Sequence, residues 1–370
     1  MLLKRTDEDA YFAASNSEKG FFSYYSQCFD APRVDHVYAI KGGPGTGKSR
    51  FMREVSSAAE RVGWSCEYIY CSSDPNSLDG IILSKGKKGE CIALLDATAP
   101  HVYEPERPGS REDLVNLGLF WDVEKLSSHK EEIEVLNEQK EEAYRRAYRY
   151  LAGVGECIRT RDALMAPYVR HEEIKRLAER LLKRIPAGTE YQASPALIHS
   201  LGMRGRVMLD TYLRKAQVIF RIADCRGIGK YLLGEIGRIA MEKRLSVRLS
   251  YDPVYPEALD GIFLKDAGVC FLICEEALCQ KEHKTLWMRR FADPISSSSV
   301  KDDVRYAERM QKAMLLGAID ALSRVKEIHF SLEEIYATAM DFSQKEVFTK
   351  EFCKKLLHLQ NGEDYDIIEP

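Results

Sequence analysis

A glycine-rich segment between an apolar run and an amphipathic run constrains this chain more than any other feature. The apolar residues 37–40, Val-Tyr-Ala-Ile, lead through Lys41 into residues 42–49, Gly-Gly-Pro-Gly-Thr-Gly-Lys-Ser. From residue 48 to residue 62, apolar side chains recur at helical spacing and stop before Gly63. The pattern predicts a strand, a tight loop and a helix in immediate succession, as in an α/β fold.

The same segment fits the phosphate-binding pattern called the P-loop, Gly-x-x-x-x-Gly-Lys-Ser. Backbone N–H groups can surround a polyphosphate only where glycines allow close approach, and the following helix adds its own unpaired N–H groups. Lys48 is expected to reach the β- and γ-phosphate oxygens, and the Ser49 hydroxyl to bind Mg²⁺. We therefore predict that ATP and Mg²⁺ bind at Gly42, Gly43, Pro44, Gly45, Thr46, Gly47, Lys48, Ser49 and Arg50.

Further candidate residues follow the predicted strands. Residues 92–96, Ile-Ala-Leu-Leu-Asp, read as a buried strand that presents Asp96 at its carboxyl end, where ligands bind in an open parallel sheet. Asp96 is the second predicted magnesium ligand, and a turn or capping role is the alternative. Asp74 either orients or deprotonates a water, or is a turn residue. Thr98 is a candidate sensor of the γ-phosphate. His101 either contacts substrate or lies at the surface.

The chain also contains an internal repeat. Residues 219–231 resemble residues 37–49, and Lys230 lies 182 positions after Lys48. Gly20 and Gly205 match at an offset of 185, and the Leu-Asp-Gly turns at residues 78–80 and 259–261 match at 181. Because the offset falls steadily, we infer a duplication, with copies near residues 10–188 and 195–362.

The second copy has lost the residue types that the site needs. Its changes are Gly42 to Asp224, Ser49 to Tyr231, Asp74 to Tyr255 and Asp96 to Cys274. Tyrosine cannot replace a small hydroxyl ligand, cysteine is a poor ligand for hard Mg²⁺, and a carboxylate repels phosphate. The sequence predicts that the second copy binds no Mg-nucleotide, although Lys230 remains.

Long helical patterns follow each copy. Apolar side chains recur at helical spacing from about residue 121 to 185, with a break at Pro167, and again from about residue 310. We expect a helical hairpin projecting from each copy, which either packs the copies together or acts as a lid or partner-binding arm.

The predicted fold class is α/β: a P-loop NTPase-type parallel sheet, duplicated, with long helical hairpins after each copy. Strands are expected at residues 66–71 and 91–95, with a solvated basic turn at residues 84–89. The predicted domains are a nucleotide-binding domain (1–110), a helical hairpin (111–190), a degenerate second domain (191–295) and a C-terminal helical region (296–370).

Composition narrows the class of protein. A net charge of −3 and a pI of about 6.3 give no nucleic-acid signature, and the Arg- and Tyr-rich residues 144–150 point to several faces of a helix. The acidic start of the chain and the short apolar runs predict neither a signal peptide nor a membrane span. Ten cysteines without CxxC spacing indicate a cytoplasmic protein. Cys270, Cys274, Cys279 and His283 are read as buried thiols near a histidine, with a metal cluster as the alternative.

Three stretches carry a resemblance to a known family. They are residues 43–49, residues 71–80 and residues 95–101, the last reading Leu-Asp-Ala-Thr-Ala-Pro-His. They resemble a family of uncharacterised bacterial tandem P-loop ATPases, known mainly from spore-forming Gram-positive lineages, over most of the chain. The resemblance implies a P-loop nucleoside-triphosphate hydrolase fold and nucleotide binding, but no substrate. Members are often intact in both loops, and this chain departs in the second.

The favoured function is a Mg-dependent ATPase with Lys48, Asp96 and Asp74 as its catalytic residues. The sequence has no Asn-Lys-x-Asp motif for guanine, and Asp96 is followed by Ala97 rather than by a catalytic glutamate, so hydrolysis is expected to be slow. One alternative is a small-molecule or nucleotide kinase, with Asp74 as base and the helices as a lid. The other is a non-catalytic nucleotide sensor whose helices bind a protein partner.

Overall fold

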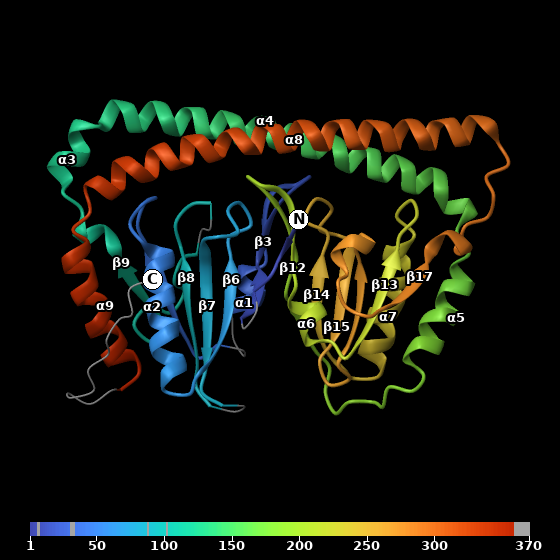
Figure 1. Cartoon of the computed structure of the whole chain (residues 1–370), viewed down its shortest axis with the longest axis horizontal. Helices are drawn as coiled ribbons and strands as arrows, with labels where there is room; N and C mark the ends of the chain where they lie inside the picture. The colour runs from blue at the N-terminus through green and yellow to red at the C-terminus, as the bar shows by residue number, and fades with distance from the viewer. Residues whose placement is uncertain (6–7, 30–33, 87–88, 101–102, 359–370) are drawn as a thin grey trace.

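The computed structural model describes residues 1–358 except residues 6–7, 30–33, 87–88 and 101–102. Two six-stranded sheets lie beneath two long helices in the view of Figure 1. The first sheet has the strand order β2 (Asp9–Phe12), β6 (Ser65–Tyr70), β7 (Leu78–Ser84), β8 (Cys91–Asp96), β5 (His36–Lys41), β9 (Glu112–Asn116). The second has the order β10 (Gln192–Pro195), β14 (Ser246–Tyr251), β15 (Leu259–Leu264), β16 (Val269–Ile273), β13 (Val218–Ala223), β17 (Lys284–Trp287). The α/β class is confirmed.

The two sheets repeat one architecture, which we call the first half (residues 9–120) and the second half (residues 192–291). Corresponding strands occupy corresponding places, and an irregularity between Ile69 and Tyr70 recurs between Ser250 and Tyr251. Helix α2 (Lys48–Arg61) packs on β7, and helix α7 (Gly229–Glu242) packs on β15. The repeat inferred from the sequence is therefore visible in the strand order.

The sheets are mixed, which corrects the predicted parallel sheet. Strand β7 runs antiparallel to both β6 and β8, and β15 likewise runs antiparallel to β14 and β16. The predicted turn at residues 78–80 forms the first three residues of β7. Antiparallel pairing follows from connection length, because a parallel crossover needs a dozen or more residues and only six or seven separate these strands.

Each half also extends a hairpin to the other half. The hairpins are β3 (Ala14–Ser17) with β4 (Gly20–Ser23), and β11 (His199–Gly202) with β12 (Gly205–Leu209), which also pairs with β1 (Leu2–Leu3). The Met203 N–H donates to the Ser73 carbonyl at 2.9 Å, and the Glu18 N–H donates to the Val254 carbonyl at 2.9 Å. Short helices α1 (Tyr25–Phe29) and α6 (Thr211–Lys215) follow the hairpins, and one apolar core joins the two halves.

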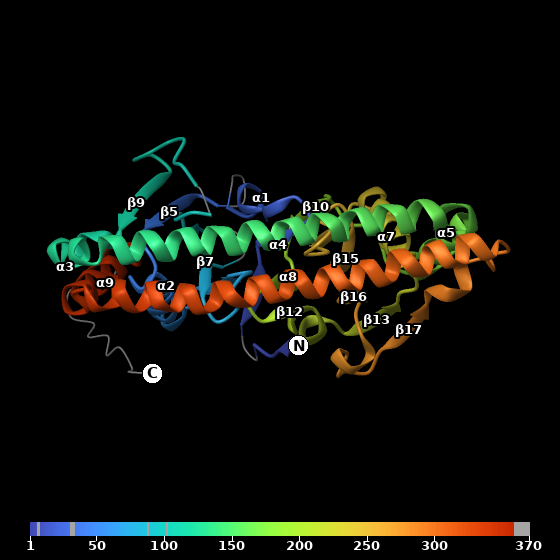
Figure 2. The ribbon, with the colours of Figure 1, turned by 90° about the horizontal axis from the view of Figure 1, so that it is seen from above.

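The long helices exchange between the halves. After η1 (Leu117–Phe120) and α3 (Val123–Ser128), helix α4 (Lys130–Met165) leads through η2 (Ala166–Tyr168) to α5 (His171–Leu182), which packs on α7. Helix α8 (Ser298–Thr338), preceded by η3 (Glu276–Leu278) and η4 (Met288–Phe291), runs back to α9 (Phe342–Leu356), which packs on α2. Figure 2 shows α4 and α8 side by side along the molecule.

The prediction of a helical hairpin on each copy is wrong in its partners. The 36-residue α4 packs along the 41-residue α8, because the 12-residue α5 is too short to cover its apolar face. The exchange is two-fold symmetric in pattern. The bridges Trp121–Met340 and Val169–Ala292 swap into each other under a shift of 171 residues.

Two further findings bear on the predicted organisation. Strand β9 belongs to the first sheet, so the first half extends beyond the predicted boundary at residue 110. Among the described residues, the structure contains no helix with the length and apolar character needed to cross a membrane.

Candidate functional site

The glycine-rich loop (residues 42–49) joins β5 to α2. Gly45 and Gly47 have φ angles of 70° and 75°, in the left-handed region that favours glycine. Gly47 is the residue that caps α2, and Thr46 Oγ1 donates to the Gly43 carbonyl at 3.0 Å inside the loop. The glycine spacing is therefore required by the backbone path that turns the strand into the helix.

The structure brings Lys48 and Asp96 together at this loop. Lys48 Nζ donates to the carbonyls of Gly42 (2.7 Å) and Gly43 (2.8 Å) and lies 3.5 Å from Asp96 Oδ2. Asp96 ends β8, beside Ile40 of the parallel strand β5. Both charged side chains are 13% exposed, so the ammonium and the carboxylate are held in a largely desolvated position.

Thr98 lies against the same loop. Its hydroxyl donates to the Gly42 carbonyl at 2.8 Å, and its N–H donates to Asp96 Oδ1 at 2.8 Å. A hydroxyl at this position can contact an anion that the loop binds. His101, the other candidate in this segment, lies outside the described residues.

Ser49 and Arg50 point in different directions at the start of α2. The Ser49 hydroxyl accepts a hydrogen bond from the Leu78 N–H at 3.0 Å, at the start of β7. Arg50 is exposed and pairs with Glu54 one turn along the helix at 2.8 Å. The Ser49 hydroxyl and the Asp96 carboxylate are hard oxygen donors on either side of Lys48, which fits a magnesium ion held together with a phosphate. Arg50 is tied to its helical neighbour instead.

Asp74 lies at the junction of the halves. Its carboxylate accepts the Asn76 N–H at 3.3 Å and lies 3.7 Å from Nε of Arg204, which connects β11 to β12. It therefore occupies a turn, as the alternative interpretation of this residue expected. The structure does not show its carboxylate paired with Lys48 or Asp96.

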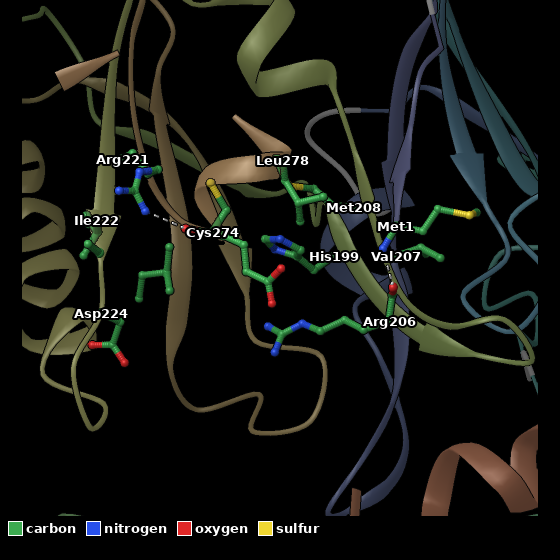
Figure 3. A pocket seen from close by; sticks show the side chains of 13 residues that line it. Met1, His199, Arg206, Val207, Met208, Arg221, Ile222, Asp224, Cys274 and Leu278 are labelled. Atoms are coloured by element: carbon green, nitrogen blue, oxygen red, sulfur yellow. Dashed lines mark hydrogen bonds between the residues drawn. The ribbon is translucent and has the colours of Figure 1, made fainter. Parts of the chain in front are cut away.

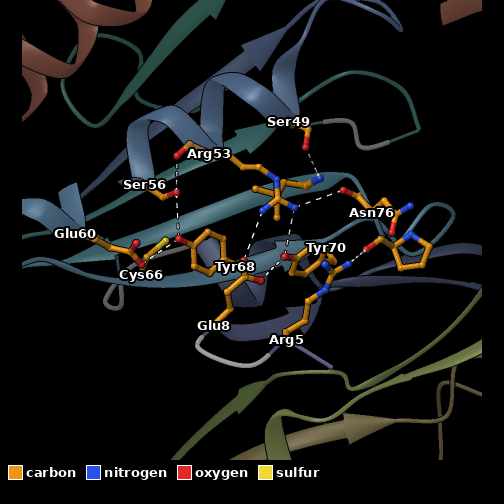
Figure 4. Close-up of polar contacts among 12 residues, drawn as sticks. Arg5, Glu8, Ser49, Arg53, Ser56, Glu60, Cys66, Tyr68, Tyr70 and Asn76 are labelled. Atoms are coloured by element: carbon orange, nitrogen blue, oxygen red, sulfur yellow. Dashed lines mark hydrogen bonds and ion pairs between the residues drawn. The ribbon is translucent and has the colours of Figure 1, made fainter. Parts of the chain in front are cut away.

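A polar network fixes α2 on β6, next to the turn of Asp74 (Figure 4). Arg53 donates to the Tyr70 hydroxyl at 3.4 Å, and that hydroxyl donates to Glu8. The Arg5 guanidinium lies 4.2 Å from the Tyr70 ring centroid and donates to the Pro75 carbonyl at 2.5 Å. The loop thus begins a helix whose position is set by contacts that the sequence motif does not include.

The end of α8 covers the glycine-rich loop. A Cβ placed on Gly45 would lie 2.5 Å from the Glu333 carbonyl oxygen and 3.0 Å from the Ala337 nitrogen. A Cβ on Gly43 would lie 3.3 Å from the rings of Trp121 and Tyr336. The sequence gave no signal for these neighbours, because they come from a helix that begins on the other half.

The corresponding second loop (residues 224–231) is occupied by the protein's own groups. The Asp224 carboxylate accepts the N–H groups of Gly227 (2.9 Å) and Gly229 (2.6 Å). Lys230 donates to the carboxylate of Asp162 from α4. Since loop amides and ammonium are already satisfied by carboxylates, this arrangement agrees with the expected loss of anion binding.

The counterpart of Asp96 in the second half differs from the expected residue. Leu95 pairs with Gly80, and the equivalent pair in the second sheet is Leu272 with Gly261. The register therefore aligns Asp96 with Ile273 instead of Cys274. The conclusion is unchanged, because isoleucine supplies no metal ligand.

A cavity of about 530 Å³ lies beside the second loop (Figure 3). Its charged lining is already paired: Arg206 contacts Asp252 at 2.9 Å, and His199 Nδ1 lies 2.7 Å from Asp260 Oδ2. Burial raises the pKa of Cys274, which also lines the cavity, to about 12. Cys270 and Cys279 are buried nearby, so this cysteine group has the character of core thiols.

Comparisons of the chain with protein-family models, with curated proteins and with solved structures gave no match. The site is therefore interpreted from its own geometry, and the family resemblance stays a prediction.

Proposed function

We propose that this chain is an ATP-binding protein of P-loop NTPase type that hydrolyses Mg-ATP at one site, the glycine-rich loop. The observation that carries the proposal is the position of Lys48, whose ammonium lies 3.5 Å from Asp96 within a loop of left-handed glycines. A triphosphate needs close backbone approach, a cation and a metal-binding carboxylate, and these three features meet here.

In this proposal the loop amides bind the phosphates, and Lys48 exchanges its bonds to two loop carbonyls for bonds to phosphate oxygens. Ser49 and Asp96 would hold Mg²⁺, which supplies charge neutralisation of the phosphates when bound. Thr98, fixed between Gly42 and Asp96, is positioned to contact the terminal phosphate. The ten free cysteines support a reducing compartment, the cytoplasm.

A non-catalytic nucleotide sensor is the second candidate. It is favoured by the two long helices, which contact both loops: α8 packs on Gly45, and α4 pairs Asp162 with Lys230. Such helices can transmit the occupancy of one loop to a protein partner without turnover. The kinase alternative is weakened for Asp74 as base, because that carboxylate is engaged by Asn76 and Arg204.

Metal-dependent turnover by the purified protein tests the proposal. We expect Mg²⁺-dependent phosphate release from ATP that is abolished in Lys48→Ala. Tight binding with negligible release would favour the sensor, and a rate increase on adding a small-molecule or nucleotide acceptor would favour a kinase. Preferential use of GTP would overturn the assignment of ATP.

A further inference from the structure

Helix α4 crosses the carboxyl-end edge of the first sheet with a fixed rotation. The Tyr144 hydroxyl donates to Ser73 Oγ, just beyond the end of β6, at 3.4 Å. The Tyr148 hydroxyl donates to Asn16 Oδ1 at 3.0 Å. These tyrosines are four residues apart, so one face of α4 is directed at the sheet edge where β5 continues into the glycine-rich loop.

Lys140 lies on this face, one turn before Tyr144. Its side chain is half-buried, and within the described part of the chain its ammonium forms no hydrogen bond or ion pair. Burial lowers the pKa of Lys140, and the positive charge of Lys48 lowers it further, against an opposing effect of Glu141. The two ammonium groups therefore sense each other.

We propose that Lys140 binds the terminal phosphate of the nucleotide held by the glycine-rich loop, an inference that rests on the function proposed above. The loop amides and Lys48 approach the phosphates from the side of α2, whereas Lys140 approaches from the helix that crosses the sheet edge. Two ammonium groups that share one carboxylate, Asp96, leave a local excess of positive charge. A polyphosphate neutralises that excess, and the attraction is strong because the groups are partly removed from water.

The second half provides an internal comparison. The shift of 171 residues that exchanges the interhelix bridges aligns Lys140 with Gln311 of α8. Gln311 is neutral, and its side-chain oxygen accepts a hydrogen bond from Arg161 at 3.3 Å. The cation is thus present near the loop that keeps Ser49 and Asp96, and absent near the loop that has lost both. Packing alone does not require this coincidence.

The test compares the affinities for Mg-ATP and Mg-ADP by calorimetry, because only ATP carries the phosphate in question. Lys140→Gln should weaken ATP binding about ten- to hundredfold, the range expected for a charged hydrogen bond, and change ADP binding by less than about twofold. Lys140→Arg should restore most of the preference for ATP. Lys130→Gln is the matched control on α4, since Lys130 is exposed and pairs with Glu134 at 3.8 Å.

Each outcome decides the matter. If ATP and ADP weaken together in Lys140→Gln, or neither weakens, while Lys48→Ala abolishes binding, Lys140 has no such role and the proposed function stands. If the wild-type protein binds neither nucleotide, both proposals fall. Lys140→Met, which keeps the apolar stem, gives the same comparison if the glutamine variant unfolds.

Discussion

Alanine at Gly45 should destabilise the protein more than alanine at Gly227, its counterpart in the second loop. The φ angles are 70° and 79°, so a Cβ in the left-handed region costs about 1–2 kcal/mol at either position. The surroundings differ. At Gly45 the new Cβ meets the α8 backbone at 2.5 Å from the Glu333 oxygen, whereas at Gly227 its nearest contact is the mobile end of Arg161, at 2.4 Å from Nη2.

The difference between the two variants isolates the contact with α8. A side-chain end can rotate away, but a helix backbone must shift, and overpacking of that kind typically costs about 1–3 kcal/mol. We therefore expect losses in the free energy of unfolding of roughly 2–5 kcal/mol for Gly45→Ala and roughly 1–2 kcal/mol for Gly227→Ala.

Urea unfolding followed by circular dichroism measures both losses. Fluorescence of Trp121 adds a local probe, because its ring lies at the glycine-rich loop and 5.5 Å from the Tyr336 ring. Equal losses in the two variants, with Trp121 unaffected in Gly45→Ala, would refute the packing of α8 on the loop.

Two further predictions concern the second loop and pH. Asp224→Ala removes the acceptor of two loop N–H groups and should lower the free energy of unfolding by about 1–3 kcal/mol in urea, without creating a second nucleotide site; new binding would contradict the assignment of Tyr231 and Ile273 as non-ligands. Since burial lowers the pKa of Lys140, its charge is lost at a lower pH than that of an exposed lysine. The preference for ATP over ADP should therefore decline as the pH rises into the alkaline range in the wild type and stay flat in Lys140→Gln, and parallel profiles would contradict this.

The sequence predicted the features that depend on local pattern. Residues 42–49 announce their strand, loop and helix, because the glycines satisfy backbone angles and the flanking runs have clear periodicity. The buried strand that ends at Asp96 and the internal repeat were equally accessible. The meeting of Lys48 with Asp96 followed from strand direction alone.

Other features depended on partners that periodicity does not specify. A helical stripe has the same spacing whether it packs on a neighbouring helix or on one 171 residues away, so the exchange of α4 and α8 was not predicted. The antiparallel β7 could have been found from its short connections. Lys140 also left a signal, since it interrupts an apolar stripe between Leu136 and Ala143.

Calorimetric titration with Mg-ATP tests the central claim, that one loop of the two binds nucleotide. We predict one ATP per chain in the wild type, no binding in Lys48→Ala, and unchanged affinity and stoichiometry in Lys230→Ala, whose ammonium is paired with Asp162. Two ATP per chain, equal losses in the two variants, or no heat from the wild type would contradict the account.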